Sequence, residues 1–536
     1  MKYQPARMWA IPLAILLWCL AAPVHAGAQA GTGTLSGAVV DDQGASLPGS
    51  LVTVTEQATG AVRTTPTDRD GLFRITGLPP GRYTIQITLE GFSPLKMTDI
   101  PLAPVEVRNL DKLQMKVGQR TESVIVTADT ATVQTANSSR VGTVTSDQLT
   151  NIQMKGRDIW GLMAVVPGVQ DTNMNRNFTT WTSMAGISIN GMPNTSKVVT
   201  MDGVSIIDEL GSNAMVNPNI DAVGEVQVIS NGFTAENGRS NGGLIVMTTK
   251  SGTSSIKGSA WYNARRTEWN ANDYFRRKQH LSKNLYHVNI PGYSIGGPIV
   301  IPKVVDKGKA FFFVSQEFTD DLRESTLTRV NYPTALERMG DFSQTFFGNA
   351  NGPGQGTLLQ IIDPVTGKQF PGNKIPANRI SPLGVQALNL LPLPNDIHDT
   401  ALNQYNASNS LYETLPLHSR TNSTVRLDVV MNQSVRGSFR FIKDREDNIS
   451  NNRFAPGLGT TNNAVPGKLM TFSSTQVLRT SMVNEVTSGY ARNSYGFRPA
   501  EGKYSYDPRD WYRSALGFDP PRLEPFGAYR DPPGLG

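Results

Sequence analysis

Side chains that could carry out metal-dependent catalysis are few in this sequence, and the histidines among them match no metal-ligand spacing. Of the five histidines, His280 and His287 do not match the HExxH spacing of a zinc protease, and no acidic residue is placed to act as their base. His398 and His418 fall in a long segment rich in proline, glycine and asparagine. The sequence has no phosphate-binding P-loop. It therefore predicts no enzyme activity, no metal site and no cofactor.

Two groups of acidic residues have spacings that could support chemistry. Glu317 with Asp320 and Asp321 could supply paired carboxylates for acid–base catalysis, but the solvated end of a strand explains this run better. The run 68–71, Asp-Arg-Asp-Gly, is similar to the start of a calcium loop. Because the later ligands and the closing glutamate are missing, we predict a hairpin turn there.

Residues 1–30 have the three parts of a secretory signal peptide. A basic start precedes an apolar stretch at 8–22, and small residues allow cleavage after Ala26 or Ala30. Cleavage at either position would remove Cys19, the one cysteine, so the mature chain would have neither disulfides nor a thiolate metal site. We therefore expect an exported protein.

The composition favours many short strands over helical bundles. The 536 residues include 50 glycines and 34 prolines, and 38% of the residues are hydrophobic. No segment after the signal has 18 continuous apolar residues, so an exported strand-rich chain of this kind is either soluble or a membrane β-barrel. The net charge of +6 is dispersed among acidic residues, and we expect no nucleic-acid partner.

Residues 31–117 have the pattern of a compact all-β unit. Alternating or β-branched runs are separated by turn residues, which predicts several short strands. The stretch 67–92 resembles the carboxypeptidase-regulatory-like β-sandwich, a fold also grouped with carbohydrate-binding-like domains. The resemblance implies a periplasmic appendage and no peptidase chemistry.

Residues 136–256 are predicted to form a small α+β domain. Apolar residues at helical spacing in 158–166 end at a Pro-Gly pair, and short β-branched strands follow between glycine turns. These runs resemble the plug domain of TonB-dependent outer-membrane receptors, although an unrelated α+β domain could use the same turns. The residues that carry the resemblance are Pro167, Gly168, Asp202, Gly203, Glu225, Gly242, Gly243 and Lys250.

Between these units, residues 118–135 form a polar linker that contains a β-branched run. The run consists of Glu122, Ser123, Val124, Ile125, Val126, Thr127 and Ala128. It is similar to a TonB box, which in that family recruits the energy-coupling complex TonB–ExbB–ExbD. A mobile strand with unpaired backbone groups can add to the sheet edge of a partner. The alternative is that this run is the last strand of the preceding sandwich.

Residues 257–536 alternate in the manner of membrane barrel strands. Apolar residues at Val435, Gly437, Phe439 and Phe441 are predicted to face lipid, with the polar residues between them facing the lumen. The three phenylalanines at 311–313 are expected to belong to an aromatic girdle. Several runs in this part resemble the Oar-like subgroup of TonB-dependent receptors. The segment of about 328–418 is predicted to be a long extracellular loop for substrate capture or surface contact.

We also expect these residues to be the N-terminal portion of a longer barrel. Plugged transporters use about 22 strands of roughly 9–11 residues each, so the strands alone need about 220 residues. The part from 257 onward contains a long loop and cannot supply them all. The run 531–536, with two prolines and two glycines, is unsuited to a closing strand.

The sequence thus predicts a mainly β protein with a sandwich, a plug and part of an antiparallel outer-membrane barrel. The resemblance implies a receptor that takes up a large or scarce substrate, an oligosaccharide or a chelate, by energy-coupled plug rearrangement. The expected partners are the TonB complex, outer-membrane lipid and an extracellular substrate, for which a carbohydrate is one candidate. Two alternatives are an outer-membrane-anchored adhesion or surface-organising protein without transport, and a soluble carbohydrate-binding protein.

Overall fold

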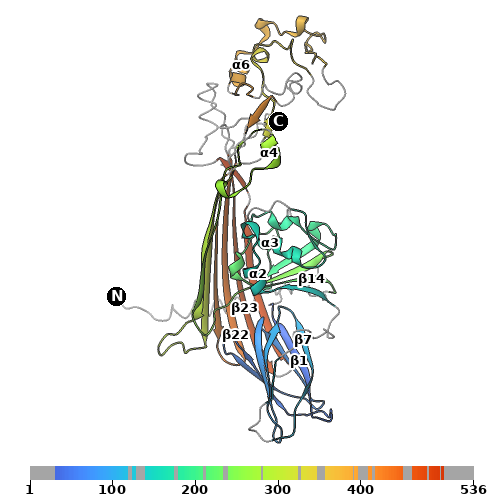
Figure 1. The fold of residues 1–536 in the computed structure, drawn as a ribbon, viewed down its shortest axis with the longest axis vertical. Helices are drawn as coiled ribbons and strands as arrows, with labels where there is room; N and C mark the ends of the chain where they lie inside the picture. Colours follow the sequence, from blue (N-terminus) through green and yellow to red (C-terminus); the bar gives the residue numbers. More distant parts are fainter. Residues whose placement is uncertain are drawn as a thin grey trace, which may run out of the picture.

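The structure is a computed structural model that describes most of the chain from residue 31 to residue 499 (Figure 1). The described residues are 31–118, 124–127, 139–173, 179–208, 213–232, 240–278, 280, 282–323, 328–346, 357–389, 391–395, 409–412, 417–450, 461–479, 482–494 and 496–499. The predicted signal peptide with Cys19, the run 531–536, and Glu122, Ser123 and Ala128 of the linker lie outside these residues.

The N-terminal unit is a sandwich of two sheets. One sheet has the order β4-β1-β7 and the other β3-β2-β5-β6-β8, and the apolar core lies between them. The strands are β1 (Gly33–Val40), β2 (Leu51–Glu56), β3 (Val62–Pro66), β4 (Leu72–Leu78), β5 (Gly81–Thr88), β6 (Leu95–Leu102), β7 (Val107–Gln114) and β8 (Val124–Thr127). The run 68–71 forms a turn, held by hydrogen bonds to Asp68. However, it joins strands of different sheets, so the predicted hairpin is wrong.

The unit predicted to be a plug domain, which we call the plug, is built on a mixed five-stranded sheet of order β13-β12-β15-β14-β9. The strands of this sheet are β9 (Arg140–Val144), β12 (Lys197–Met201), β13 (Val204–Ser205), β14 (Val223–Asn231) and β15 (Gly243–Thr249). A separate two-stranded sheet pairs β10 (Val169–Asp171) with β11 (Ile187–Ile189). The helices of the plug are α2 (Ser146–Asn151), η1 (Lys155–Arg157), α3 (Ile159–Leu162), η2 (Met163–Val165), η3 (Ser183–Gly186), η4 (Asn194–Ser196) and η5 (Ile220–Ala222). The apolar face of α3 packs into the plug core, where Trp160 is fully buried.

Long antiparallel strands run beside the plug and the sandwich in one sheet (Figure 1). These are β16 (Lys257–Arg266), β17 (Tyr286–Pro298), β18 (Ala310–Arg323), β21 (Leu417–Val430), β22 (Val435–Ser450), β23 (Thr461–Arg479) and β24 (Met482–Asn493), with β25 (Gly496–Pro499) paired to β23. Among the described strands the sheet is open, with β16 and β24 at its edges. We call this sheet the wall.

The predicted alternation of the wall strands is confirmed on β22 and corrected on β18. Phe439 is 40% exposed on the outer face, whereas Arg440 beside it is buried on the plug side. The phenylalanines at 311–313 do not form a girdle together, because successive strand residues point to opposite faces. Phe311 and Phe313 are buried on the inner face.

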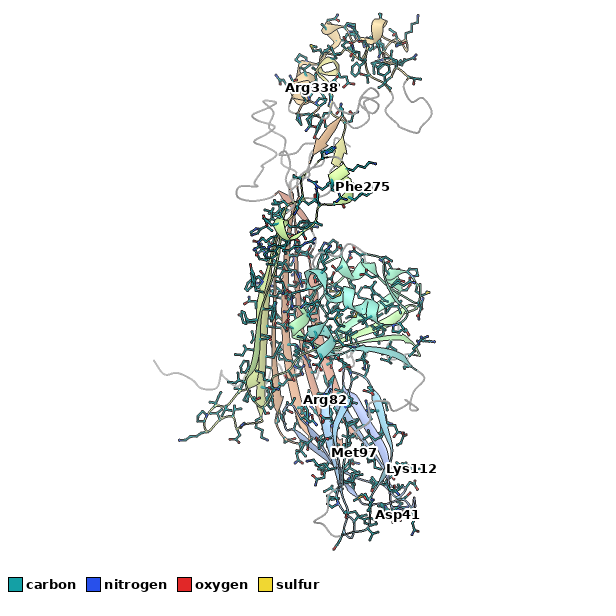
Figure 2. The ribbon with its side chains drawn as sticks, viewed as in Figure 1. Asp41, Arg82, Met97, Lys112, Phe275 and Arg338 are labelled. Atoms are coloured by element: carbon teal, nitrogen blue, oxygen red, sulfur yellow. The ribbon has the colours of Figure 1, made fainter. Side chains whose placement is uncertain are left out.

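The predicted long loop contains a small folded module beyond the ends of the wall strands (Figure 2). Figure 2 shows Phe275 and Arg338 toward this end and Asp41 and Lys112 at the opposite end. The elements of the module are β19 (Thr328–Val330), α5 (Ala335–Arg338), η8 (Pro371–Asn373), η9 (Ala377–Arg379), α6 (Pro382–Asn389) and β20 (Ser410–Tyr412). The connection between β16 and β17 contains η7 (Thr267–Trp269) and α4 (Tyr274–Lys278). The Asp363–Arg379 ion pair, at 2.7 Å, stabilises the module. His418, predicted in the loop, lies in β21.

No helix among the described residues is both long enough and apolar enough to cross a membrane.

Candidate functional site

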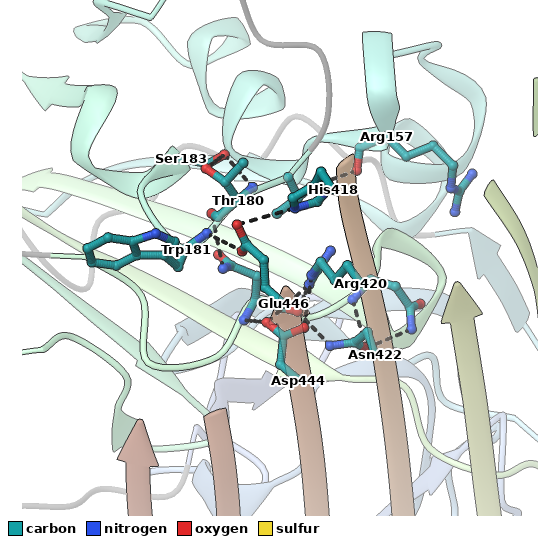
Figure 3. A network of polar contacts seen from close by, with 12 residues as sticks. Arg157, Thr180, Trp181, Ser183, His418, Arg420, Asn422, Asp444 and Glu446 are labelled. Atoms are coloured by element: carbon teal, nitrogen blue, oxygen red, sulfur yellow. Dashed lines mark hydrogen bonds and ion pairs between the residues drawn. The ribbon is translucent and has the colours of Figure 1, made fainter. Parts of the chain in front are cut away.

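The inner faces of β21 and β22 contact the plug through a buried polar network (Figure 3). Arg420 Nε donates a hydrogen bond to Asp444 Oδ1 at 2.8 Å, and the two side chains are 3% and 8% exposed. The guanidinium also donates to the backbone carbonyl of Asn217 in the plug. The Asn217 backbone N–H donates to Asp444 Oδ2 at 2.8 Å. The ion pair therefore binds both backbone groups of one plug residue and fixes that residue against the wall.

Amide side chains extend this network to a third strand and into the plug core. Asn422 Nδ2 donates to the Asn217 carbonyl at 2.6 Å, and Asn219 Nδ2 donates to Asn422 Oδ1 at 3.0 Å. Ser315 of β18 donates to Asn219 Oδ1 at 3.1 Å, and Trp160 Nε1 donates to Asn217 Oδ1 at 2.6 Å. Each of these groups is buried, so the bonds replace water that the groups have lost on folding.

Glu446 forms a second bridge between β22 and the plug. One of its oxygens accepts a hydrogen bond from the Trp181 backbone N–H at 2.7 Å. The other oxygen lies 3.2 Å from His418 Nε2, and both side chains are 3% exposed. This carboxylate therefore joins the plug segment before η3 to two neighbouring wall strands.

Arg157 of the plug forms a third bridge, to β18. Its Nε donates to Glu317 Oε2 at 2.8 Å, and its guanidinium also pairs with Asp221. Trp261 Nε1 donates to the same Glu317 oxygen at 3.1 Å, and the Arg157 guanidinium lies 4.9 Å from the Trp261 ring centroid. The prediction that Glu317 and Asp321 occupy a solvated strand end is wrong. Both are buried, because β18 continues to residue 323 and turns these odd-numbered residues inward.

The predicted plug residue Asp202 lies at the end of β12 and faces the wall. It accepts hydrogen bonds from the backbone and hydroxyl of Thr249, each at 3.0 Å, since β12 and β15 are parallel neighbours. Its Oδ2 lies 3.3 Å from Arg440 Nε, and Arg426 donates to the Thr249 carbonyl. Gly203 follows with φ of +84°, a conformation that favours glycine.

The other predicted plug residues lie at turns and strand ends. Pro167 and Gly168 form the turn between η2 and β10, and a Cβ on Gly168 would lie 2.7 Å from Asn190 Oδ1. Gly242 and Gly243 lead into β15. Lys250 follows that strand, and burial lowers its pKa. The structure thus brings Asp202, Gly203 and Lys250 to one end of the plug sheet, with Gly242 and Gly243 at the other end of β15.

Glu225 lies where the sandwich meets the plug sheet. Val105, in the loop between β6 and β7, packs against the plug residues Ile229, Leu244 and Val246. The Glu225 Oε1 atom is buried and has no hydrogen-bond partner among the described residues. Burial, and after it the negative charge of Glu106 in the sandwich, raises the pKa of Glu225 to about 8.

A pH dependence of stability follows from Glu225. Because its folded pKa lies above the value of about 4.3 for an unfolded glutamate, the folded protein binds the extra proton between these values. Stability should therefore fall as pH rises from about 4.3 through about 8. Glu225→Gln is expected to flatten this slope in melting temperatures measured across the range, while exposed Glu90→Gln should leave it intact. An unchanged slope in the Glu225 variant would contradict the assignment.

The predicted TonB box is placed partly within the sandwich. Residues Val124–Thr127 form β8, which pairs in parallel with β6 at the edge of the five-stranded sheet. This is the arrangement expected from the alternative that the run is the last sandwich strand. Its role as a partner-binding strand stays a prediction.

The sandwich also contacts the wall directly. Arg436 Nη1 of β22 lies 3.6 Å from Glu56 Oε2, and Thr32 Oγ1 donates to Glu485 of β24 at 2.8 Å. Burial raises the pKa of Glu56, and the charge of Arg436 acts in the opposite direction. The sandwich therefore contacts the inner face of the wall through an ion pair and a hydrogen bond, as the plug does through its polar network.

Sequence reasoning missed the wall residues of this network. Their signal is a row of polar residues at every second position: His418, Arg420, Asn422, Thr424 and Arg426. That pattern indicates an inward polar face, but it does not identify the plug groups that each side chain contacts. Within the described residues, no group of three or more His, Cys, Asp or Glu side chains could hold a metal ion.

Comparison with known proteins gives two family matches. The family described as "Outer membrane beta barrel domain" matches residues 248–522, and "Carboxypeptidase regulatory-like domain" matches residues 34–116. The TonB-dependent transporter Oar of Myxococcus xanthus is 28% identical over 309 residues, which are 53% of this chain and 26% of that protein. The chain therefore spans about a quarter of the length of this curated relative.

Two solved structures are similar in part. The outer membrane transporter YddB from Escherichia coli has a TM-score of 0.39 and 12% identity, covering 67% of this chain and 39% of its own. A mutant of the ferric enterobactin receptor PfeA from Pseudomonas aeruginosa has a TM-score of 0.37 and 12% identity, covering 69% and 43%. These relatives are named as transporters and receptors.

Proposed function

The chain belongs to the outer membrane β-barrel family, which matches more than half of its length, and we propose on this basis that it is a TonB-dependent receptor. In this proposal the outer-membrane protein takes up a large or scarce substrate, an oligosaccharide or a chelate, and catalyses no reaction. The similarity to a TonB-dependent transporter over 309 residues supports the proposal.

The observation that carries this proposal is the set of buried polar contacts between the plug and the wall. The Arg420–Asp444 ion pair of the wall holds the Asn217 backbone of the plug, and Asn219 of the plug donates to Asn422 of the wall. Ile442 and Leu469 of the wall add an apolar contact to the plug core. The polar groups can exchange protein partners for water at modest net cost, whereas exposed apolar surface cannot. A plug held in this way can move when pulled and return afterwards. The pull would come from the TonB complex through residues 122–128.

Edge strand β8 gives this proposal a concrete first step. Because β8 pairs only with β6 among the described strands, its other edge is open to a partner strand. TonB would add to β8 or take it from β6, and further pulling would act on the plug through the linker.

Val124→Pro is expected to abolish crosslinking of the protein to TonB, because proline removes a backbone donor and restricts the preceding residue. Val124→Thr keeps the donor and a β-branched side chain, so it serves as the matched control. Crosslinking in cells and energy-dependent uptake of a panel of oligosaccharides and ferric chelates measure the two steps. Full crosslinking by the proline variant, at an equal outer-membrane level, would refute the role of the box.

A second function is favoured by the folded module between β18 and β21. The module is stabilised by its own ion pair and by Asn373, whose amide donates to the Phe342 and Leu359 carbonyls. A folded surface module suits adhesion or surface organisation, with the sheet acting as an anchor. Uptake of each compound in the panel can be compared in cells with and without TonB, using the wild-type protein. If loss of TonB changes the uptake of none of them, this second function is favoured.

A further inference from the structure

One row of outward-facing residues crosses the whole wall at a single level. Consecutive strands pair these residues directly, from β16 to β24. The row is Ala260, Tyr293, Gln316, Ser423, Lys443, Lys468 and Arg492. It is neutral on the first four strands and cationic on the last three.

The two halves of the row differ in how their polar groups are satisfied. In the neutral half, the Tyr293 hydroxyl donates to Gln316 Oε1 at 2.9 Å, and Gln316 Nε2 donates to Ser423 Oγ at 3.2 Å. Lys443, Lys468 and Arg492 are exposed, and none has an ion-pair partner among the described residues. Like charges directly opposite each other on neighbouring strands are destabilising, since their Cβ atoms are about 4.5–5.5 Å apart. The three cations therefore repel one another unless an anion lies between them.

The row next to the cations on the outer face is entirely apolar apart from one glycine and the hydroxyl of Tyr490. It consists of Gly258, Ile295, Val314, Val425, Phe441, Met470 and Tyr490. The row after that includes Leu427, Phe439 and Phe472. An outward apolar band of this kind is the lipid-facing surface of a membrane barrel. The cations therefore lie at one boundary of the band.

This boundary is on the external side. β21 and β22 are joined by residues 431–434, and β23 and β24 by residues 480–481, at the other end of the strands. The folded module lies at the end nearer the cations, where β22 ends at Ser450 and β23 begins at Thr461. Barrels of this class have short periplasmic turns and longer extracellular loops. The sandwich contact at Arg436 lies toward the short-turn end as well.

We propose that Lys443, Lys468 and Arg492 bind the phosphate groups of lipid headgroups in the outer leaflet. The site faces away from the plug, so a transported substrate in the lumen would not reach it. It lies immediately outside the apolar band, where the headgroups of surrounding lipid must lie. Arginine and lysine bind phosphate through charge-assisted hydrogen bonds, and a phosphate between them removes their mutual repulsion. This inference rests on the outer-membrane location and not on the proposed uptake.

The test compares two triple variants of the purified full chain in neutral detergent. Lys443→Gln, Lys468→Gln and Arg492→Gln together remove the row. Lys303→Gln, Lys307→Gln and Lys309→Gln remove the same charge from the exposed β17–β18 connection at the other end of the strands. Each protein is titrated with diphosphoryl lipid A, with the same lipid after removal of its phosphates, and with inorganic phosphate. Melting temperature and lipid adducts in native mass spectrometry are measured.

The diphosphoryl lipid should bind and stabilise the wild type and the control, and its affinity for the row variant should fall at least about tenfold. The dephosphorylated lipid should not distinguish the variants. Equal binding of diphosphoryl lipid by all three proteins would overturn the proposal. So would equal stabilisation by inorganic phosphate alone, which would indicate a site for the free ion.

The melting temperature without lipid provides an independent check. Removing three unpaired like charges should leave it unchanged or raise it, because repulsion is relieved. A lower melting temperature of the row variant than of the control would show that the cations stabilise the protein without lipid. That result would also overturn the proposal.

Discussion

Arg420→Met is expected to lower the free energy of unfolding by about 3–5 kcal/mol, because it leaves the buried Asp444 carboxylate without its cation. The arginine is 3% exposed, so water cannot replace it. Methionine fills similar space, which restricts the change mainly to charge and hydrogen bonds. The Asn217 carbonyl would also lose its bond from the guanidinium. Denaturant unfolding in detergent and protease cleavage of the plug measure the loss.

A second substitution separates charge from packing. Asp444→Asn keeps an oxygen that can accept the Asn217 N–H, at present bonded at 2.8 Å, and removes the unpaired charge. The double variant Arg420→Met with Asp444→Asn should therefore recover much of the lost stability. A double variant as unstable as Arg420→Met alone would show that packing, and not the charge, stabilises this contact.

Arg445→Met is the matched control for this experiment. Arg445 Nε lies 2.8 Å from Asp447 Oδ2 on the same strand, the same separation as in the Arg420–Asp444 pair, but the arginine is 63% exposed. Exposed pairs contribute about 0–1 kcal/mol, so this variant should unfold almost as the wild type does. Equal losses from Arg445→Met and Arg420→Met would mean that burial does not determine the contribution.

The sequence predicted the wall strands wherever alternation was regular. Phe439 and Arg440 face opposite sides as expected, because side chains alternate with period two whatever the partners are. The same rule, applied to each residue of 311–313, places Phe311 and Phe313 on one face and Phe312 on the other, which excludes a girdle made of all three. The solvated strand end predicted for Glu317 is wrong for a similar reason. A run of acids looks solvated until its strand is known to continue and to meet Arg157 of the plug.

The positions of the plug turns could be read from the sequence, but their partners could not. Asp202 and Gly203 have the residue types of a turn, and Asp202 has φ of +48°. That Arg440 lies beside Asp202 depends on how the plug packs against a strand more than 200 residues later. The parallel pairing of β8 with β6 is similarly non-local, since no short turn fixes its register.

Gly467→Ala is expected to displace the plug from the wall. The glycine lies in β23 with its inner face against the plug, and a Cβ there would lie 2.0 Å from the Met215 backbone oxygen. Backbone on both sides cannot rotate away as a side chain could, so strands or plug must shift. Such overpacking costs about 1–3 kcal/mol or more. The variant should melt earlier, and its plug should be cleaved faster by protease.

Gly437→Ala in β22 is the control, because it adds the same methyl group to the outer face of the same sheet. Its Cβ would meet nothing closer than the Ser473 carbonyl oxygen at 3.9 Å, which is ordinary contact. Alanine also loses less conformational entropy on folding than glycine. This variant should therefore be as stable as the wild type or slightly more stable. If Gly437→Ala and Gly467→Ala lower the melting temperature equally, the harm comes from changing a strand glycine and not from contact between plug and wall.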